Sequence, residues 1–363
     1  MFKTRIFLTG ADSFTGSHIL AQLLSHDSVS ARLVVKSAEA AHVIWRQCQT
    51  HASSFLDAVT IADSDLLVPG VFDEALQDLS NPFSAIVHNL NVIPSDEADC
   101  LATYIRLETD AVIGFLKSVR DFAPAVTRVV IVTSLLPFAR WLGDPHIDSI
   151  AVGAIGGHSR SSSVDSEHML ATSQASSNVV SDAVIAWTKQ SGAHFDVAIV
   201  TAPSVYGPTV HPLENSSDLT ETNRRLWNIF SNEPLGQTVS PLYGINHFSD
   251  VRDVADAAVR ALFIERASNM RLVVSAGTMP SVSEIAEIIV AKFPELQSRV
   301  GIDGSPHRHE QCNDMPPDFL DTYLMATILG VTNLRSAEVT VTDTVRQMLD
   351  LQQRKAWRSI TQN

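Results

Sequence analysis

The sequence predicts a doubly wound α/β fold, in which helices cover both faces of a mainly parallel sheet. Short apolar runs rich in Val and Ile alternate with longer helical patterns through roughly the first 200 residues. Continuous apolar runs of this kind are typical of strands buried on both faces, as in a parallel sheet. A glycine-rich turn lies between the first run and the first helical pattern, where proteins of this class bind ligands.

These patterns place the individual elements. Strands are expected at TRIFLT, ARLVVKS, DAVTIADSD, SAIVHN, RVVIVTS and DVAIVTAP. Helices are expected at HILAQLLS and at residues 73–79, 99–120, 178–191, 223–231, 252–265, 282–292 and 342–353. Residues 141–178 are rich in Gly and Ser, which predicts no regular element there and favours a flexible lid over a pocket. The pattern changes near residue 208, so we expect a first domain over 1–207 and a smaller C-terminal lobe over 208–363, with some elements returning to the first domain.

Composition and charge exclude several classes of function. Hydrophobic residues make up 45% and charged residues 18% of the 363 residues, and no run of about 18 uncharged apolar residues could span a membrane. The formal charge of −14 and the dispersed basic residues argue against a nucleic-acid partner, which needs clustered Lys and Arg. The three scattered cysteines predict reduced thiols, and the first residues show no secretory signal pattern. A cytoplasmic protein with a small-molecule substrate is therefore expected.

The strongest local signal is the turn TGADSFTGSHIL at residues 9–20, between the first strand and the first helix. Gly10 permits a tight turn and Gly16 permits close packing of the helix, whose N-terminal N–H groups can bind a pyrophosphate. Ser13 occupies the position where a middle glycine would let the backbone approach phosphate most closely. The Ser13 Cβ either crowds a cofactor or shifts its position. The alternative to phosphate binding is a loop that needs glycine only because its backbone has positive φ.

Two further residues bear on a dinucleotide. Lys36 follows the second strand, where an acidic residue would hold the ribose 2′-hydroxyl, and a cation there suits the 2′-phosphate of NADP. The alternative is a solvated surface lysine. Asp65 ends the third apolar run and could accept a hydrogen bond from the adenine amino group, or it could simply cap a turn.

Motifs along nearly the whole chain carry a resemblance to a known family. TGADSFTGSHIL, SDLLVPGVFDEA, AIVHNLN, RVVIVTS, HFDVAIVTAPSVYGPTVHP and FSDVRDVADAAVRAL follow one another in the order found in the extended short-chain dehydrogenase/reductases. The chain most resembles the branch of dihydroflavonol reductases and fungal aldehyde and ketone reductases, within the NAD-dependent epimerase/dehydratase type. The resemblance implies a Rossmann domain and an NADP groove lined by Gly10, Asp12, Ser13, Phe14, Thr15, Gly16, Lys36, Asp65, Leu66, Asn89, Pro203 and Val205.

The chain departs from this family at the residues that carry the chemistry. Members reduce carbonyls with a Tyr that donates a proton, a Lys four residues later and a Ser that orients the substrate oxygen. None of the four tyrosines in this chain is followed four residues later by lysine. Alignment through AVIAWTKQSG puts Ala175 in the Tyr position and Val179 in the Lys position. Leu135 falls at the position of the catalytic Ser, and Ser134 precedes it. A shift of the alignment by one residue would place Ser134 at the catalytic position.

Several residues could replace the missing chemistry. His158 and His168 lie in the Gly/Ser-rich segment, and either could act as an acid or base at neutral pH, or could be a solvated loop residue. Ser134, or one of the serines at 161–163, could form a Ser/His/Asp arrangement with His158 and Asp165, although no nucleophile-elbow motif supports this. For His88, at a strand end, and for Tyr206, in SVYGP, a packing role is favoured over catalysis.

A metal site is the last possibility that the sequence raises. His307, His309 and Cys312 have ligand-like spacing, but they fall in a loop, and no metal is expected there.

The leading interpretation is an enzyme of this fold that lacks the reductase pair and catalyses a non-reductive step, such as cyclisation, isomerisation, dehydration or hydrolysis. Its substrate would be a small molecule like those of secondary metabolism, held in the cleft between the lobes. Two alternatives stay open: an NADP-dependent reductase with a relocated proton donor, and a non-catalytic protein that senses NADP(H) or a metabolite. The resemblance also implies a homodimer through two long helices.

Overall fold

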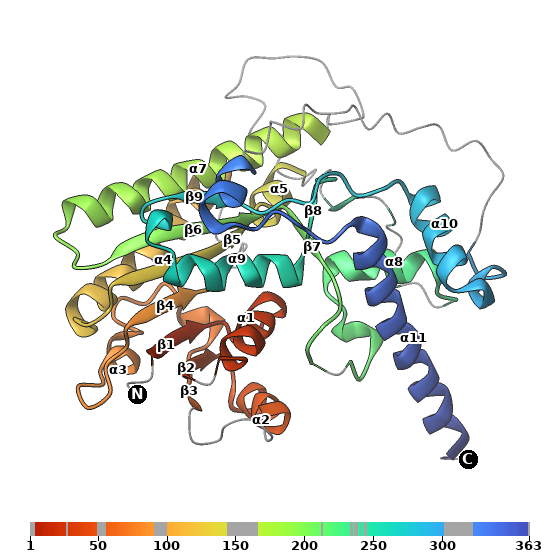
Figure 1. Ribbon diagram of the computed structural model, residues 1–363, viewed down its shortest axis with the longest axis horizontal. Coiled ribbons are helices and arrows are strands. Elements are labelled where there is room, and N and C mark those ends of the chain that lie inside the picture. The colour runs from red at the N-terminus through yellow and green to blue at the C-terminus, as the bar shows by residue number, and fades with distance from the viewer. Residues whose placement is uncertain are drawn as a thin grey trace.

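The computed structural model describes most of the chain. The described residues are 4–26, 28–48, 56–90, 100–143, 166–211, 213–232, 235, 239, 241–242, 245–300 and 322–361. Figure 1 shows a sheet between helices with a helical lobe beside it. No helix in the described ranges is long and apolar enough to cross a membrane.

The centre of the molecule is a parallel sheet of seven strands, which confirms the predicted fold class. Its order is β3-β2-β1-β4-β5-β6-β9. The bounds are β1 Thr4–Thr9, β2 Val29–Val35, β3 Leu56–Thr60, β4 Ala85–His88, β5 Arg128–Ser134, β6 Asp196–Ala202 and β9 Arg271–Val273. The chain leaves β1 toward β2 on one side and later returns to place β4 on the other side. The carboxyl ends of β1 and β4 therefore form a topological switch point, where doubly wound folds bind their ligands.

Alternation along the strands divides the sheet core into two layers. Ile6 and Leu8 face one layer, whereas Phe7 between them faces the other. The first layer is covered by α1 Phe14–Leu24, α2 Ala38–Cys48 and α9 Val251–Phe263. The second is covered by α3 Asp73–Leu76, α4 Leu101–Phe122 and α7 Ser166–Gln190. Both faces of the sheet are thus buried, as its continuous apolar strands require.

The C-terminal lobe has a core of its own beside the carboxyl ends of β5 and β6 (Figure 1). Two short parallel strands, β7 Ser204–Tyr206 and β8 Phe248–Asp250, join it to the sheet. Its helices are α8 Glu221–Phe230, α10 Val282–Lys292 and α11 Ala337–Thr361. After residue 208, α9 and β9 belong to the layers of the large sheet rather than to this core.

The Gly/Ser-rich stretch is the main place where the expected elements are wrong. We expect no regular structure over 141–178, but α5 runs from Leu136 to Gly143 and α7 begins at Ser166. Ser177 lies in α7 and is buried, and the hydroxyls of Ser176 and Ser181 donate to carbonyl oxygens four residues earlier. A helix whose buried face is built from serines shows little apolar periodicity, so the sequence pattern misses it.

Two smaller corrections concern the ends of elements. The helix expected to reach residue 79 ends at Leu76, and the side chain of Leu79 is 91% exposed. The third strand ends at Thr60, so Asp65 lies in the short 3-10 helix Asp63–Asp65 that follows rather than at the strand end.

Candidate cofactor and substrate site

The turn after β1 is built around two glycines that no other residue could replace without movement. Gly10 has a φ of +64°, and a Cβ there would lie 2.2 Å from the Asn89 carbonyl oxygen at the end of β4. A Cβ on Gly16 would lie 1.9 Å from the Gly10 carbonyl oxygen. The two glycines therefore let β1, β4 and the start of α1 approach one another at the switch point.

Ser13 is the N-cap of α1. Its Oγ accepts a hydrogen bond from the Gly16 N–H at 3.0 Å and another from the Asn89 Nδ2 at 2.8 Å. The hydroxyl is thus turned toward the helix and β4, a role that the sequence pattern does not reveal because capping depends on rotamer and on a distant amide.

Two N–H groups at the start of α1 remain available to a ligand. The Phe14 and Thr15 N–H groups make no hydrogen bond with any residue in the described part of the chain, whereas Gly16 N and Ser17 N bond to Ser13. Free N–H groups and the positive end of the helix dipole favour an anion at this position.

The residues expected near the ribose and adenine surround the ends of β2 and β3. An Asp12 carboxylate oxygen accepts from the Lys36 N–H at 3.3 Å, which joins the glycine-rich turn to the end of β2. The Lys36 side chain is exposed, so its ammonium is free to reach a phosphate in solution. Asp65 is also exposed and accepts from the Ser64 hydroxyl at 3.1 Å, while Leu66 is buried.

Thr9, His88 and Asn89 form a hydrogen-bonded group where β1 and β4 end. The Thr9 Oγ1 accepts from the Asn89 N–H at 2.9 Å and bonds to the His88 Nδ1 at 3.0 Å. The His88 ring stacks on Phe115 with centroids 4.0 Å apart. Burial lowers the pKa of His88 to about 3, so the ring is neutral near pH 7. These contacts support the packing role that the sequence favours for His88.

The opposite end of the groove contains Ser134, Pro203 and Val205. The Ser134 hydroxyl donates to the Pro203 carbonyl oxygen at 3.4 Å and accepts from the Leu136 N–H at 3.2 Å. Val205 is half-buried, and its carbonyl oxygen accepts from Thr222 of α8 at 2.6 Å. Ser134 is therefore engaged with the backbone of α5 and of Pro203 between β6 and β7, and its role as a catalytic group stays a prediction.

The position expected for the catalytic serine is filled by an apolar side chain. Leu135 is wholly buried in a small cluster that residues from several separate segments complete. These residues are Ala139, Met169, Leu170, Ile245 and Val273, with Leu136 packed against them. No hydroxyl can occupy this position without replacing the leucine.

The residues that the sequence comparison assigns to the Tyr and Lys positions, Ala175 and Val179, lie on α7. Both Ala175 and Val179 are exposed, and Val179 has 55% of its surface accessible. An alanine and a valine cannot donate a proton, so the expected catalytic pair is absent from these positions. His168 lies in the first turn of the same helix.

Several predicted residues fall outside the described ranges. These are His158, the serines at 161–163, Asp165, His307, His309 and Cys312, together with the side chain of His168. Within the described residues, no group of three or more His, Cys, Asp or Glu side chains could hold a metal ion.

Tyr206 lies in the core of the C-terminal lobe. Its side chain is buried, and its hydroxyl accepts a hydrogen bond from the Arg225 guanidinium of α8 at 3.2 Å. Arg225 is itself buried and donates to the Val239 carbonyl oxygen at 2.5 Å. These contacts support packing rather than proton donation for Tyr206.

Comparison with known proteins gives relatives of one kind. No family model matches the sequence. The ketoreductase azaE of Aspergillus niger is 27% identical over 356 residues, which are 95% of this chain and 98% of that protein. An uncharacterised oxidoreductase of Schizosaccharomyces pombe is 25% identical over 301 residues, covering 80% of this chain and 82% of that protein. The relatives by sequence are thus oxidoreductases.

Solved structures share the fold over nearly the whole chain. The yeast methylglyoxal/isovaleraldehyde reductase Gre2, solved with NADPH, superposes with a TM-score of 0.70 at 20% identity, covering 97% of this chain and 100% of that one. A UDP-glucuronic acid 4-epimerase from Bacillus cereus, solved with NAD, gives a TM-score of 0.56 at 14% identity over 96% of this chain and 97% of that one. These similarities confirm the predicted Rossmann-type fold and its likeness to reductases and epimerases.

Proposed function

We propose that this chain is an enzyme of the short-chain dehydrogenase/reductase fold that binds NADP(H) and catalyses a non-reductive step on a small, largely apolar molecule. The observation that carries the proposal is Leu135, buried in an apolar cluster where the reductase serine is expected. Ala175 and Val179 at the Tyr and Lys positions agree with it. The chain would thus have the fold of a reductase without the Tyr that donates the proton.

The residues at the switch point fit a dinucleotide. A pyrophosphate would bind to the Phe14 and Thr15 N–H groups at the start of α1, which Gly10 and Gly16 bring close to the ends of β1 and β4. The Lys36 ammonium would hold the 2′-phosphate of NADP, and Asn89, Pro203 and Val205 would line the rest of the groove. When bound, the cofactor supplies hydride chemistry or serves as a fixed part of the pocket wall.

Loss of the donor is expected to suppress carbonyl reduction. A positioned acid typically contributes about 10²–10⁴ in rate, and here the Tyr, Lys and Ser positions all lack the required group. A substrate held in the cleft can still react by positioning together with one acid or base, such as His158, His168 or Ser134. Cyclisation, isomerisation, dehydration and hydrolysis require no hydride.

The first experiment separates cofactor binding from reduction. NADPH binding is followed by the change in its fluorescence, and NADPH oxidation is followed by its absorbance with a broad panel of aldehydes and ketones. We expect binding without turnover. Robust turnover would overturn the non-reductive proposal, and absence of binding would overturn the cofactor proposal.

A second experiment tests whether the lack of Tyr and Lys at positions 175 and 179 is the reason for the expected lack of carbonyl reduction. The double variant Ala175→Tyr/Val179→Lys restores both groups at exposed positions, where they should not disturb the core. Measurable carbonyl reduction by this variant, but not by Ala175→Phe/Val179→Met as a control of similar size, is expected. Equal activity of the two variants and the natural chain would argue against these positions as the Tyr and Lys sites.

A reductase with a different proton donor is the second candidate, since a ketoreductase is 27% identical over 95% of the chain. Of the donors considered, Ser134 is half-buried at the groove end, whereas Tyr206 is held in the lobe core by Arg225. If the natural chain oxidises NADPH with a carbonyl substrate, Ser134→Ala should abolish the activity and Tyr206→Phe should leave most of it.

A further inference from the structure

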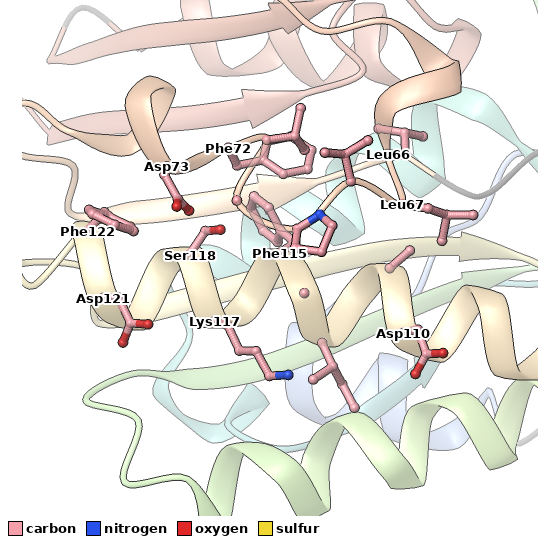
Figure 2. Close-up of a pocket in the computed structure, with 17 residues that line it drawn as sticks. Leu66, Leu67, Phe72, Asp73, Asp110, Phe115, Lys117, Ser118, Asp121 and Phe122 are labelled. Carbon is pink, nitrogen blue, oxygen red and sulfur yellow. The ribbon is translucent and has the colours of Figure 1, made fainter.

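A cavity of about 400 Å³ lies between α4 and residues 66–73, the segment that leads into α3 (Figure 2). Its volume is that of a site for a small molecule, since ligand pockets span roughly 300–1,000 Å³. Its lining does not include Ser134, Ala175 or Val179. Of the residues expected to line the NADP groove, it includes Leu66 alone among its described lining residues.

One part of this cavity is apolar. Its lining includes Leu66, Pro69, Phe72, Ile113 and Phe115. The floor is opened by Gly114, in the middle of the long helix α4, where an added Cβ would meet no atom within 4 Å. Glycine weakens a helix interior relative to alanine, and here its effect on shape is to widen the cavity.

The other part of the cavity is lined by Ser118, whose hydroxyl oxygen is accessible from the cavity although the residue as a whole is buried. Ser118 is only 4% exposed, yet its Oγ makes no hydrogen bond with any residue in the described ranges. By contrast, the Thr109 hydroxyl of α4 and the Thr188 hydroxyl of α7 each donate to the carbonyl oxygen four residues earlier. Figure 2 shows the Ser118 hydroxyl and the Asp73 carboxylate directed toward the same end of the cavity.

The charges around the cavity leave a carboxylate at that end. Asp110 pairs with Arg106 at 3.4 Å and Asp121 pairs with Arg120 at 2.8 Å. Asp73 forms no ion pair or side-chain hydrogen bond within the part of the chain that the structure describes. Figure 2 shows the Lys117 ammonium pointing away from both Asp73 and Ser118. The acceptors available at the end of the cavity near Asp73 and Ser118 are therefore the Asp73 carboxylate and the Ser118 hydroxyl oxygen.

We propose that this cavity binds a small molecule with an apolar body and a protonated amine. The ammonium would donate to the Asp73 carboxylate and to the Ser118 Oγ, and a hydrogen bond between an ammonium and a carboxylate is stronger than one between neutral groups. The apolar body would lie against Leu66, Phe72 and Phe115 over the opening at Gly114. An anionic ligand of the same shape would meet the Asp73 carboxylate and be excluded.

The position of the cavity connects this ligand to the cofactor groove. A second, smaller cavity shares Leu66, Phe72 and Ala111 with the first and extends to His88 and Leu90 at the end of β4. Leu66 is one of the residues expected to line the NADP groove. Amine binding should therefore change the affinity for NADPH, and NADPH should change the amine affinity by the same factor. This coupling rests on the proposed function, whereas the amine site itself does not.

The test uses phenethylamine as the probe, with phenethyl alcohol and hydrocinnamate as neutral and anionic molecules of similar shape. Binding to the full chain is measured by isothermal titration calorimetry without NADPH and then with saturating NADPH. The variants are Ser118→Ala, Asp73→Asn and Gly114→Leu. Ala102→Leu, at an exposed position of the same helix, controls for adding a leucine to α4.

We expect phenethylamine to bind and hydrocinnamate not to bind. Asp73→Asn should weaken phenethylamine binding about ten- to a hundredfold and Ser118→Ala about fivefold. Gly114→Leu should abolish it, while Ala102→Leu leaves it unchanged. Far-ultraviolet circular dichroism checks that each variant is folded.

Three outcomes would overturn the proposal. They are tighter binding of hydrocinnamate than of phenethylamine, an affinity unchanged by Asp73→Asn, and binding that survives Gly114→Leu. If phenethylamine binds as expected while NADPH does not bind at all, the amine site stands and the proposed cofactor function fails. If both bind without affecting each other, the coupling through Leu66 is wrong.

Discussion

His88 illustrates how single polar residues at the switch point serve the structure. Its ring stacks on Phe115, bonds to Thr9 and is almost fully buried. The same Thr9 hydroxyl accepts from the Asn89 N–H, so one hydroxyl holds both residues at the end of β4. The hydrogen-bonding groups of Thr9 and His88 are therefore engaged within the protein at the ends of β1 and β4.

The pKa of His88 predicts a dependence of stability on pH. Burial lowers the pKa from 6.5 to about 3, so between these values the unfolded chain binds a proton that the folded chain does not. The free energy of unfolding should therefore decrease as the pH falls through this range, by about 1.4 kcal/mol per pH unit from this residue. Urea unfolding of the natural chain and of the His88→Phe variant at several pH values from 5 to 6.5 measures how the free energy of unfolding depends on pH. The free energy of unfolding of the variant should change less with pH than that of the natural chain. Equal slopes for the two proteins would contradict the lowered pKa of His88.

Leu135 predicts the cost of restoring the reductase serine. Leu135→Ser would remove a buried side chain, leave a cavity and bury a hydroxyl among apolar groups, which should lower the free energy of unfolding by about 3–5 kcal/mol. Leu67→Ser, at a side chain that is 44% exposed, should change it by less than about 0.5 kcal/mol. Chemical denaturation of both variants measures the difference. Equal effects would show that the apolar cluster around Leu135 contributes little.

At the scale of elements, the start of α1 is fixed by a side-chain cap. Ser13 caps the helix and accepts from Asn89, which leaves the Phe14 and Thr15 N–H groups for an anion. With glycine in place of Ser13, the Gly16 N–H would also be available to a phosphate. The serine removes that contact, but it stabilises the start of the helix.

Removal of this cap should have a measurable effect. Ser13→Ala is expected to lower the free energy of unfolding by about 1–2 kcal/mol, because the Gly16 N–H and the Asn89 amide each lose their acceptor. Ser64→Ala, at an exposed serine bonded only to its neighbour Asp65, should have almost no effect. Thermal unfolding of both variants provides the comparison, and an unchanged Ser13→Ala protein would contradict the capping role.

The helix α7 shows why an element can be hidden in its sequence. Its buried face includes Ser173 and Ser177 next to Val180 and Val184, and it packs against α4. Small residues allow the two helices to approach closely, but they contribute almost nothing to an apolar pattern. A period of 3.6 in hydrophobicity therefore appears only over the second half of the helix, where the expected element began.

At the scale of the whole molecule, one buried ion pair joins the two lobes. Asp250, at the end of β8, is completely buried and accepts from Arg252 and from the Thr340 hydroxyl of α11. Arg252 also pairs with Asp343 of α11 at 2.7 Å, and its carbonyl oxygen accepts from Gln22 of α1. Burial alone would raise the pKa of Asp250, but the hydrogen bonds from Arg252 outweigh it and hold that pKa below its ordinary value.

Loss of this carboxylate should destabilise the molecule strongly. Asp250→Ala leaves the Arg252 guanidinium without its buried partner and should lower the free energy of unfolding by about 3–5 kcal/mol. Asp256→Ala, at an exposed pair with Arg260, should change it by less than about 1 kcal/mol. Denaturant unfolding followed by tryptophan fluorescence measures both, and similar losses would show that the buried network is not important for stability.

Much of the fold could be predicted because its signals are local. A strand buried on both faces must be apolar over its whole length, and a tight turn between strand and helix must contain glycine. These requirements are met within a few neighbouring residues, as in β1 and the turn from Gly10 to Gly16. Part of the candidate site follows directly, because the start of α1 and the ends of β1, β2 and β4 meet wherever this order of strands occurs.

The sequence by itself thus determined the doubly wound sheet and the glycine-rich turn between its first strand and first helix, and it contains no Tyr that is followed four residues later by Lys. Only the tertiary structure decided that the Ser13 hydroxyl caps α1 and that Leu135 is enclosed by residues from four other segments. It likewise formed the cavity between residues 66–73 and α4. The physical reason is that periodicity and turn chemistry act over a few residues, whereas packing and hydrogen-bond partners depend on segments far apart in the chain.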